Sequence, residues 1–81
     1  MYKKIIKSRY DENMDCLFLT FSYEPVATEK KDVLIGNYIL KYSLTGELIY
    51  AAILDYSKRT VDGLKRLVPE VDWDNFKLGK E

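Results

Sequence analysis

The chain has 81 residues, with 13 basic and 13 acidic side chains, one cysteine and no histidine. A chain of this length makes one domain with a thin core, so we expect residues 1–81 to form a single domain. Within the chain, one cysteine excludes a disulfide, and the lack of histidine excludes Ser-His-Asp or Cys-His catalysis and the usual zinc sites. A net charge of zero gives no long-range attraction to phosphate, which disfavours nucleic acid as a partner.

The same composition bears on the cellular compartment. No apolar run approaches the about 20 residues that a membrane span needs, and the start of the chain, MYKKIIKSRY, lacks the apolar region of a signal peptide. The single thiol, Cys16, is typical of a buried small hydrophobe in a reducing compartment. We therefore expect a cytoplasmic protein with no membrane partner.

Two strands are predicted in the first part of the chain. Lys4 to Tyr10 is β-permissive, and its lysines suit the edge of a sheet. Asp11 to Asp15 then predicts a turn, because Asp and Asn side chains bond to their own backbone. Cys16 to Tyr23 alternates with a period of two. Its apolar face, which we assign to the core, consists of Leu17, Leu19, Phe21 and Tyr23.

A charged segment separates this strand from the next. Glu24 to Asp32 contains Pro25 and a run of charges, and we interpret it as a solvated loop with a short extended piece at Val26 to Glu29. The third strand is expected at Leu34 to Tyr42.

A β-hairpin is the clearest local prediction. Leu34 to Tyr42 and Glu47 to Asp55 flank Ser43 to Gly46, where the glycine can take a positive φ. Leu48 to Leu54 is apolar at odd and even positions alike, which predicts a central strand with both faces covered.

Beyond Asp55 the apolar period changes to about 3.6, which predicts a helix at Thr60 to Val68. Ser57 or Thr60 would cap it, and Pro69 would end it. The expected fold is α+β: a four-stranded antiparallel β-meander with one C-terminal amphipathic helix packed on one face.

One segment has part of a calcium-loop pattern. Asp11, Asn13 and Asp15 alternate like the first ligands of such a loop, but Cys16 and Ser22 stand where the loop needs glycine and a bidentate carboxylate. The pattern therefore indicates a plain β-turn and no metal.

Paired carboxylates are the catalytic chemistry that this composition still permits. Asp11, Asp15, Glu47 and Asp55 are candidates, but turns and strand ends need the same residues for structural reasons. We expect no enzyme, no catalytic residue and no cofactor.

Aromatic and basic residues leave a binding function open. Tyrosines near the strands, interleaved with Lys41, Lys58 and Arg59, could bind nucleic acid or a small ligand on a sheet face. A possible basic contact face on the helix consists of Lys58, Arg59, Lys65 and Arg66, which a solvated helix face explains equally well.

The second face of the sheet is the expected interface. If Leu48, Tyr50, Ala52 and Leu54 face the helix, a second apolar set remains, and one helix does not cover both faces. We expect a homodimer packed through this set, with the tail around Trp73 and Phe76 as the alternative cover. The predicted interface residues are Phe18, Ile39, Ile49, Ala51 and Ile53.

Several segments together resemble a small prokaryotic family catalogued as domain of unknown function 2283 (DUF2283). The resemblance lies in Tyr10-Asp11 before an acidic turn, Asp15 to Leu19, Ala27 to Glu29, Tyr38 to Tyr42, Thr45 to Ile49 and Ile53 to Arg59. It gives a family-like core at about 6–59 and a C-terminal helix and tail at 57–81. The resemblance implies a compact meander with a helix and no established enzymatic activity. It also suggests an antitoxin-like protein-interaction module with a small toxin-like partner.

Overall fold

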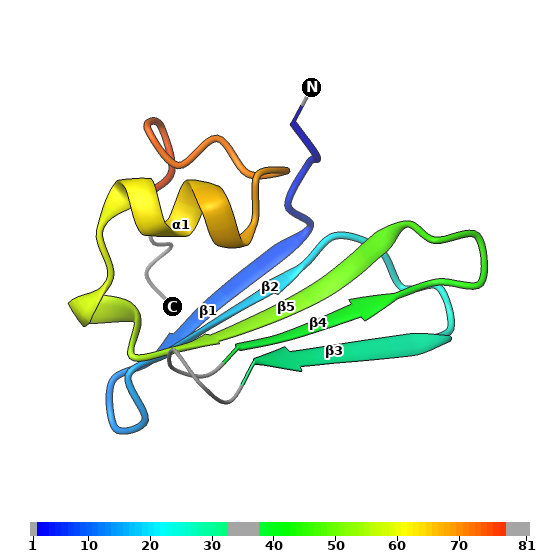
Figure 1. Ribbon diagram of the computed structural model, residues 1–81, viewed down its shortest axis with the longest axis horizontal. Helices are drawn as coiled ribbons and strands as arrows, with labels where there is room; N and C mark the ends of the chain where they lie inside the picture. Colours follow the sequence, from blue (N-terminus) through cyan, green and yellow to red (C-terminus); the bar gives the residue numbers. More distant parts are fainter. Residues whose placement is uncertain (1, 33–37, 78–81) are drawn as a thin grey trace.

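The computed structural model describes residues 2–32 and 38–77, which form one antiparallel sheet and one α-helix (Figure 1). The elements are β1 (Lys7–Asp11), β2 (Cys16–Thr20), β3 (Thr28–Asp32), β4 (Tyr38–Tyr42), β5 (Leu48–Leu54), the 3₁₀ turn η1 (Tyr56–Lys58) and α1 (Val61–Leu67). The predicted α+β class and antiparallel sheet are confirmed. The predicted number of strands is wrong, because the described residues contain five.

The additional strand is β3, which lies in the segment predicted as a solvated loop. It pairs with β4 from Thr28 opposite Tyr42 to Asp32 opposite Tyr38. β3 is an edge strand, and edge strands tolerate the charged residues that made this segment resemble a loop. Residues 33–37, which include the start of the predicted third strand, lie outside the described residues.

The strand order is β1-β2-β5-β4-β3, so the sheet is not a simple meander. β5 pairs with β2 on one side and with β4 on the other. The prediction of a central strand at Leu48 to Leu54 is therefore confirmed. The meander is wrong because β2 pairs with β5 and not with the strand that follows β2 in the sequence.

The hairpin between β4 and β5 contains an irregularity that decides which side chains face the helix. The Gly46 N–H donates to the Ser43 carbonyl at 3.0 Å, and Gly46 has a φ of +87°. Tyr42 pairs with Leu48, whereas Lys41 pairs with Tyr50, so Ile49 is an extra residue in β5. This bulge shifts the alternation of β5 after its first residue.

The predicted faces of β5 are consequently wrong. Leu48 does face the helix, but Ala51 and Ile53 are also fully buried on that side, in one core with Leu64 and Val68. The other side of β5 carries Tyr50, Ala52 and Leu54. A strict period of two, without the bulge, gave the opposite assignment.

The helix α1 begins after Thr60, whose side-chain hydroxyl accepts a hydrogen bond from the Gly63 N–H at 3.0 Å. This confirms one of the two caps predicted. Leu64 and Val68 are buried against the sheet, whereas Val61, the first residue of the helix, is 46% exposed.

The tail after α1 packs on the same side of the sheet as the helix (Figure 1). Trp73 is 5% exposed, and its indole N–H donates to the Val68 carbonyl at 2.9 Å. Phe76 meets the Trp73 ring edge-on at 5.2 Å between centroids. The described tail therefore does not cover the second sheet face, contrary to one of the two covers considered above.

Candidate functional site

The candidate site is the sheet face opposite α1, which we call the helix-free face. Strand register places its members, because alternate residues of paired strands share a face. Figure 1 shows the helix and tail on the other side only. The helix-free face includes Lys7, Arg9 and Asp11 of β1, Phe18 and Thr20 of β2, Tyr50, Ala52 and Leu54 of β5, Ile39 and Lys41 of β4, and Glu29 of β3.

Two aromatic rings lie at the centre of this face, on the adjacent strands β2 and β5. The centroids of Phe18 and Tyr50 are 6.5 Å apart, and both side chains are half-buried. The Arg9 guanidinium lies over the Phe18 ring at 4.7 Å, and the Lys41 ammonium lies over the Tyr50 ring at 5.1 Å. Partial burial raises the pKa of the Tyr50 hydroxyl above its ordinary value of 10.0.

Charges of both signs surround the two rings. An Arg9 terminal nitrogen lies 3.9 Å from an Asp11 carboxylate oxygen, and the Lys41 Nζ lies 4.0 Å from a Glu29 carboxylate oxygen. Both pairs are partly exposed, so each contributes little to stability. Their effect is to give the face a mixed charge pattern and not a uniformly basic one.

The surface of the helix-free face is hollowed on both sides of Tyr50. One hollow, of about 180 Å³, is lined by Lys7, Arg9, Phe18, Thr20 and Tyr50. The other, of about 300 Å³, shares Thr20 and Tyr50 and extends to the segment that follows β2. A partner on this face would meet a shallow relief with an aromatic centre, not a deep cavity for a small ligand.

Only part of the predicted interface lies here. Phe18 and Ile39 are on the helix-free face, and Ile49 is 2% exposed and lines the larger hollow. Ala51 and Ile53 belong to the core under the helix. Sequence reasoning missed the contribution of Lys7 and Arg9, because only the pairing of β1 with β2 brings them beside Phe18.

Among the candidate carboxylates, Asp15 is the most connected. It accepts hydrogen bonds from the Tyr10 hydroxyl at 2.6 Å, the Ser57 hydroxyl at 2.7 Å and the Ser57 N–H at 3.0 Å. The Tyr10 hydrogen bond, followed by those from Ser57, lowers the pKa of Asp15, and the same bond raises the pKa of Tyr10 to about 12. Asp15 thus fastens the β1–β2 turn to η1.

The other carboxylates also have local structural roles. Asp11 accepts hydrogen bonds from the Asn13 and Met14 N–H groups, which makes the turn predicted here. Glu47 pairs with Lys3 at 2.6 Å, and Asp55, at a φ of 55°, is the residue that directly precedes η1. Within residues 2–32 and 38–77, no group of three or more Cys, Asp or Glu side chains could hold a metal ion.

Cys16 lies in the interior, and the four residues of the predicted basic face are divided between α1 and the segment before it. Cys16 is buried, as predicted, and burial raises its pKa. The Arg59 side chain donates to the Leu54 carbonyl, and Lys65 pairs with Asp74 at 3.0 Å. Lys58 and Arg59 precede α1, whereas Lys65 and Arg66 lie within it, so the prediction that all four lie on the helix is wrong.

The tyrosines do not form one stacking surface. Tyr38 and Tyr42 pack against the core under the helix, and Tyr10 and Tyr56 contact each other at 5.8 Å between ring centroids. Of the strand tyrosines, Tyr50 shares the helix-free face with Lys41.

Comparison with known proteins gave no further assignment: no family model, no curated protein and no solved structure matches the chain. The resemblance to DUF2283 therefore stays a prediction. Of the helices in the described part of the chain, none has the length and apolar character to cross a membrane.

Proposed function

We propose that the chain is a non-catalytic protein-interaction module and that the helix-free face is its docking surface. The observation that carries the proposal is the Phe18–Tyr50 pair, which lies half-buried at the centre of a sheet face without a helix above it. Aromatic residues and arginine are the types that protein interfaces concentrate. Polar residues and paired charges at the edges of the face match the rim of an interface.

The first partner that fits is a second copy of this chain. A two-fold axis places the same patch on both subunits, so a patch carrying both charge signs is able to complement itself. Arg9 and Lys41 provide the positive charges, and Asp11 and Glu29 the negative ones. Two such sheets would pack face to face at about 10 Å, and a domain with a thin core would gain stability from the apolar area buried.

The family resemblance adds a narrower proposal of the same kind. An antitoxin-like protein would offer this face to a small toxin-like protein in place of, or after separation from, a second copy. Such a partner would be recognised by an apolar centre with charges of both signs around it.

The test is the molar mass in solution, measured by light scattering at micromolar concentrations. We expect a dimer for the wild type and a folded monomer for Ile39→Asp, since this substitution puts an unpaired charge into the interface. Leu44→Asp is the matched control, because Leu44 is 87% exposed at the hairpin turn, away from this face. A monomeric wild type, or loss of the dimer in both variants, would contradict the proposal.

Single-stranded nucleic acid is a second candidate for the same face. The observation that favours it is the placement of Arg9 and Lys41 beside rings on adjacent strands, an arrangement that serves base stacking and phosphate contacts elsewhere. The two acids paired with these cations reduce the attraction. Fluorescence anisotropy with labelled oligothymidylate distinguishes it: binding that weakens steeply with salt and is lost in Tyr50→Ala would favour nucleic acid.

A further inference from the structure

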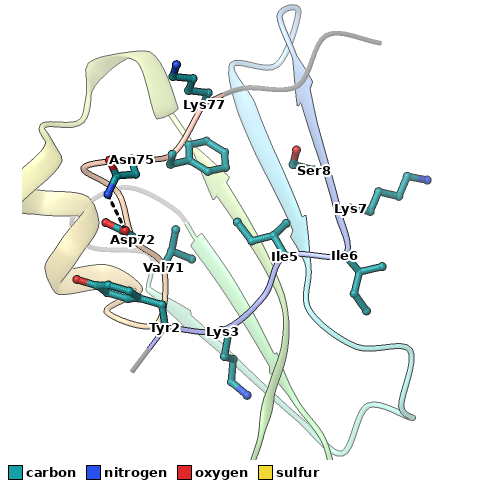
Figure 2. Close-up of a pocket in the computed structure, with 11 residues that line it drawn as sticks. Tyr2, Lys3, Ile5, Ile6, Lys7, Ser8, Val71, Asp72, Asn75 and Lys77 are labelled. Carbon is teal, nitrogen blue, oxygen red and sulfur yellow. Dashed lines mark hydrogen bonds between the residues drawn. The ribbon is translucent and has the colours of Figure 1, made fainter.

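A separate hollow lies beside β1 on the helix side of the sheet, between the N-terminal segment and the tail. It has a volume of about 370 Å³ and runs between residues 2–8 and residues 71–77 (Figure 2). In Figure 2, Ile5 and Val71 point into the space between the two segments, whereas Lys7 points away from the tail. The apolar lining includes Ile5, Val71 and Phe76, which belong to or pack against the core, and Ile6, which is 48% exposed.

This hollow adjoins an open edge of the sheet. β1 pairs with β2 and with no other described strand, so its outer backbone groups have no partner in the sheet. Along an edge strand, alternate residues direct their N–H and C=O groups outward, where an extended peptide is able to pair with them. The edge and the hollow together would hold both the backbone and the side chains of such a peptide.

The charge along this edge selects the kind of peptide. Lys7 and Lys77 line the hollow and are exposed, and Arg9 of β1 is also exposed. Among the described residues, Lys7 and Lys77 form no ion pair. On the acidic side, Asp72 already accepts a hydrogen bond from the Asn75 amide, and Asp11 lies near Arg9. The excess of positive charge favours a negatively charged strand.

We propose that the β1 edge binds an acidic extended peptide of a partner protein by strand addition. Side chains of an added strand alternate between the two faces of the sheet. Those on the helix side would enter the hollow beside Ile5 and Phe76 and should be apolar. Those on the other side would lie next to Lys7 and Arg9 and should be Asp or Glu. This extends the proposed protein-interaction role to a second surface and rests on it only for the class of ligand.

A second copy of the chain fits this edge less well than an acidic strand. If two β1 strands paired about Arg9, the two Arg9 side chains would lie opposite one another, and like charges in that position destabilise a sheet. Lysines on edge strands commonly prevent such pairing between identical chains. The same lysines attract a strand of opposite charge.

The experiment uses the full chain and a fluorescein-labelled peptide in which Asp alternates with Leu or Val. Two control peptides have the same length: one carries Lys in place of Asp, and the other is N-methylated at every second residue, which removes the N–H groups that strand pairing needs. We expect the acidic peptide to bind at least about tenfold more tightly than either control, a difference of about 1.4 kcal/mol. Amide shifts in ¹⁵N-labelled protein should centre on β1.

Protein variants separate this site from the helix-free face. Lys77→Glu should weaken peptide binding and leave the helix-free face unchanged, because Lys77 lines only the hollow beside the tail. Lys7→Glu and Arg9→Glu, made together, should weaken it further, but this double variant also alters the helix-free face. Ile39→Asp, chosen to break the dimer, should bind the peptide as the wild type does. Equal affinity for the three peptides, or amide shifts centred on Phe18 and Tyr50, would overturn the proposal whatever the oligomeric state proves to be.

Discussion

The two faces of the sheet are built from alternate residues of the same strands, yet they differ in almost every physical respect. Under the helix, Leu17, Leu19, Ala51 and Ile53 have no exposed surface. On the helix-free face, Phe18, Ile39 and Tyr50 are half-buried. Arg9 lies over the Phe18 ring, and Lys41 lies over the Tyr50 ring. The first face is a closed core, and the second is a partly exposed surface of aromatic, apolar and charged side chains, which is the composition behind the docking role proposed above.

Truncation of one isoleucine on each face gives the largest expected contrast. Ile53→Ala should cost about 2–5 kcal/mol of unfolding free energy, because Ile53 is fully buried between β2, β4 and the helix layer. Ile39→Ala should cost about 1 kcal/mol, since Ile39 is half-buried. Urea denaturation measures both at a protein concentration where each variant has the same oligomeric state.

A large cost at both positions in the monomer would break the comparison, since it would mean that the helix-free face is as tightly packed as the core. A small cost at both would show that Ile53 lies outside the core, contrary to the register of β5.

How far the sequence predicted this difference can be traced to individual residues. The alternation of Cys16 to Tyr23 assigned Leu17, Leu19 and Phe21 to the core correctly, but it was wrong for Tyr23, which lies beyond the end of β2 and is 75% exposed. For β5 it assigned Ala51 and Ile53 to the wrong face, because the extra residue at Ile49 depends on the pairing of β4 with β5. A strand that is apolar at every position has no alternation from which such a bulge could be recognised.

The candidate site was predictable only in part, for a related reason. Phe18 and Ile39 were assigned to the second face from their own strands. Arg9 joins them through the pairing of β1 with β2, and Lys41 reaches the Tyr50 ring because of the bulge. Contacts between strands distant in sequence depend on strand order, which local patterns do not determine.

The second expected effect concerns Asp15, whose hydrogen bonds connect the β1–β2 turn to η1, the 3₁₀ turn that leads to the helix. Asp15 ties η1 to the β1–β2 turn, and its pKa is lowered in the folded state, chiefly by the Tyr10 hydroxyl. A lowered pKa gives stability that is present above the ordinary Asp pKa of about 3.9 and is lost as the pH falls through the folded value. Asp15 has a φ of 51°, which asparagine tolerates. Asp15→Asn should therefore lower stability at neutral pH and remove this part of the acid dependence.

Tyr10→Phe provides the matched variant. The pKa of Tyr10 is raised to about 12, so its contribution is present below the ordinary value of 10.0 and is lost as the pH rises toward 12. The variant should lose this alkaline dependence and part of the acid dependence. Thermal unfolding followed by circular dichroism across pH measures both. Unchanged pH profiles in both variants would mean that the Tyr10–Asp15 hydrogen bond does not contribute to stability in solution.

A smaller effect is expected from the cap of the helix that covers the first face. The Thr60 hydroxyl accepts from the Gly63 N–H, and loss of such a cap costs about 1 kcal/mol. Thr60→Ala should therefore lower the urea midpoint, while Thr60→Ser, which keeps the acceptor, should stay close to the wild type. If the wild type is the proposed dimer, both variants should keep it, because the cap lies on the side of the sheet opposite the helix-free face. A monomeric Thr60→Ala would then indicate that the two faces are coupled.

The smallest effect is expected at the rim of the covered side, where the N-terminal segment is attached. The Lys3 N–H donates to the Glu70 carbonyl, and the Lys3 ammonium hydrogen-bonds to Glu47, which lowers the pKa of the Glu47 carboxyl. Lys3→Met should raise that pKa toward the ordinary Glu value, as followed by carboxyl ¹³C NMR, with little change in stability because the pair is exposed and screened by salt. Lys65→Met removes a different exposed pair, with Asp74, and should leave Glu47 unchanged. If Glu47 has the same pKa in Lys3→Met and the wild type, the Lys3 side chain does not reach the hairpin in solution. The N-terminal residues would then contribute less to the helix side of the sheet than their backbone contact with the tail implies.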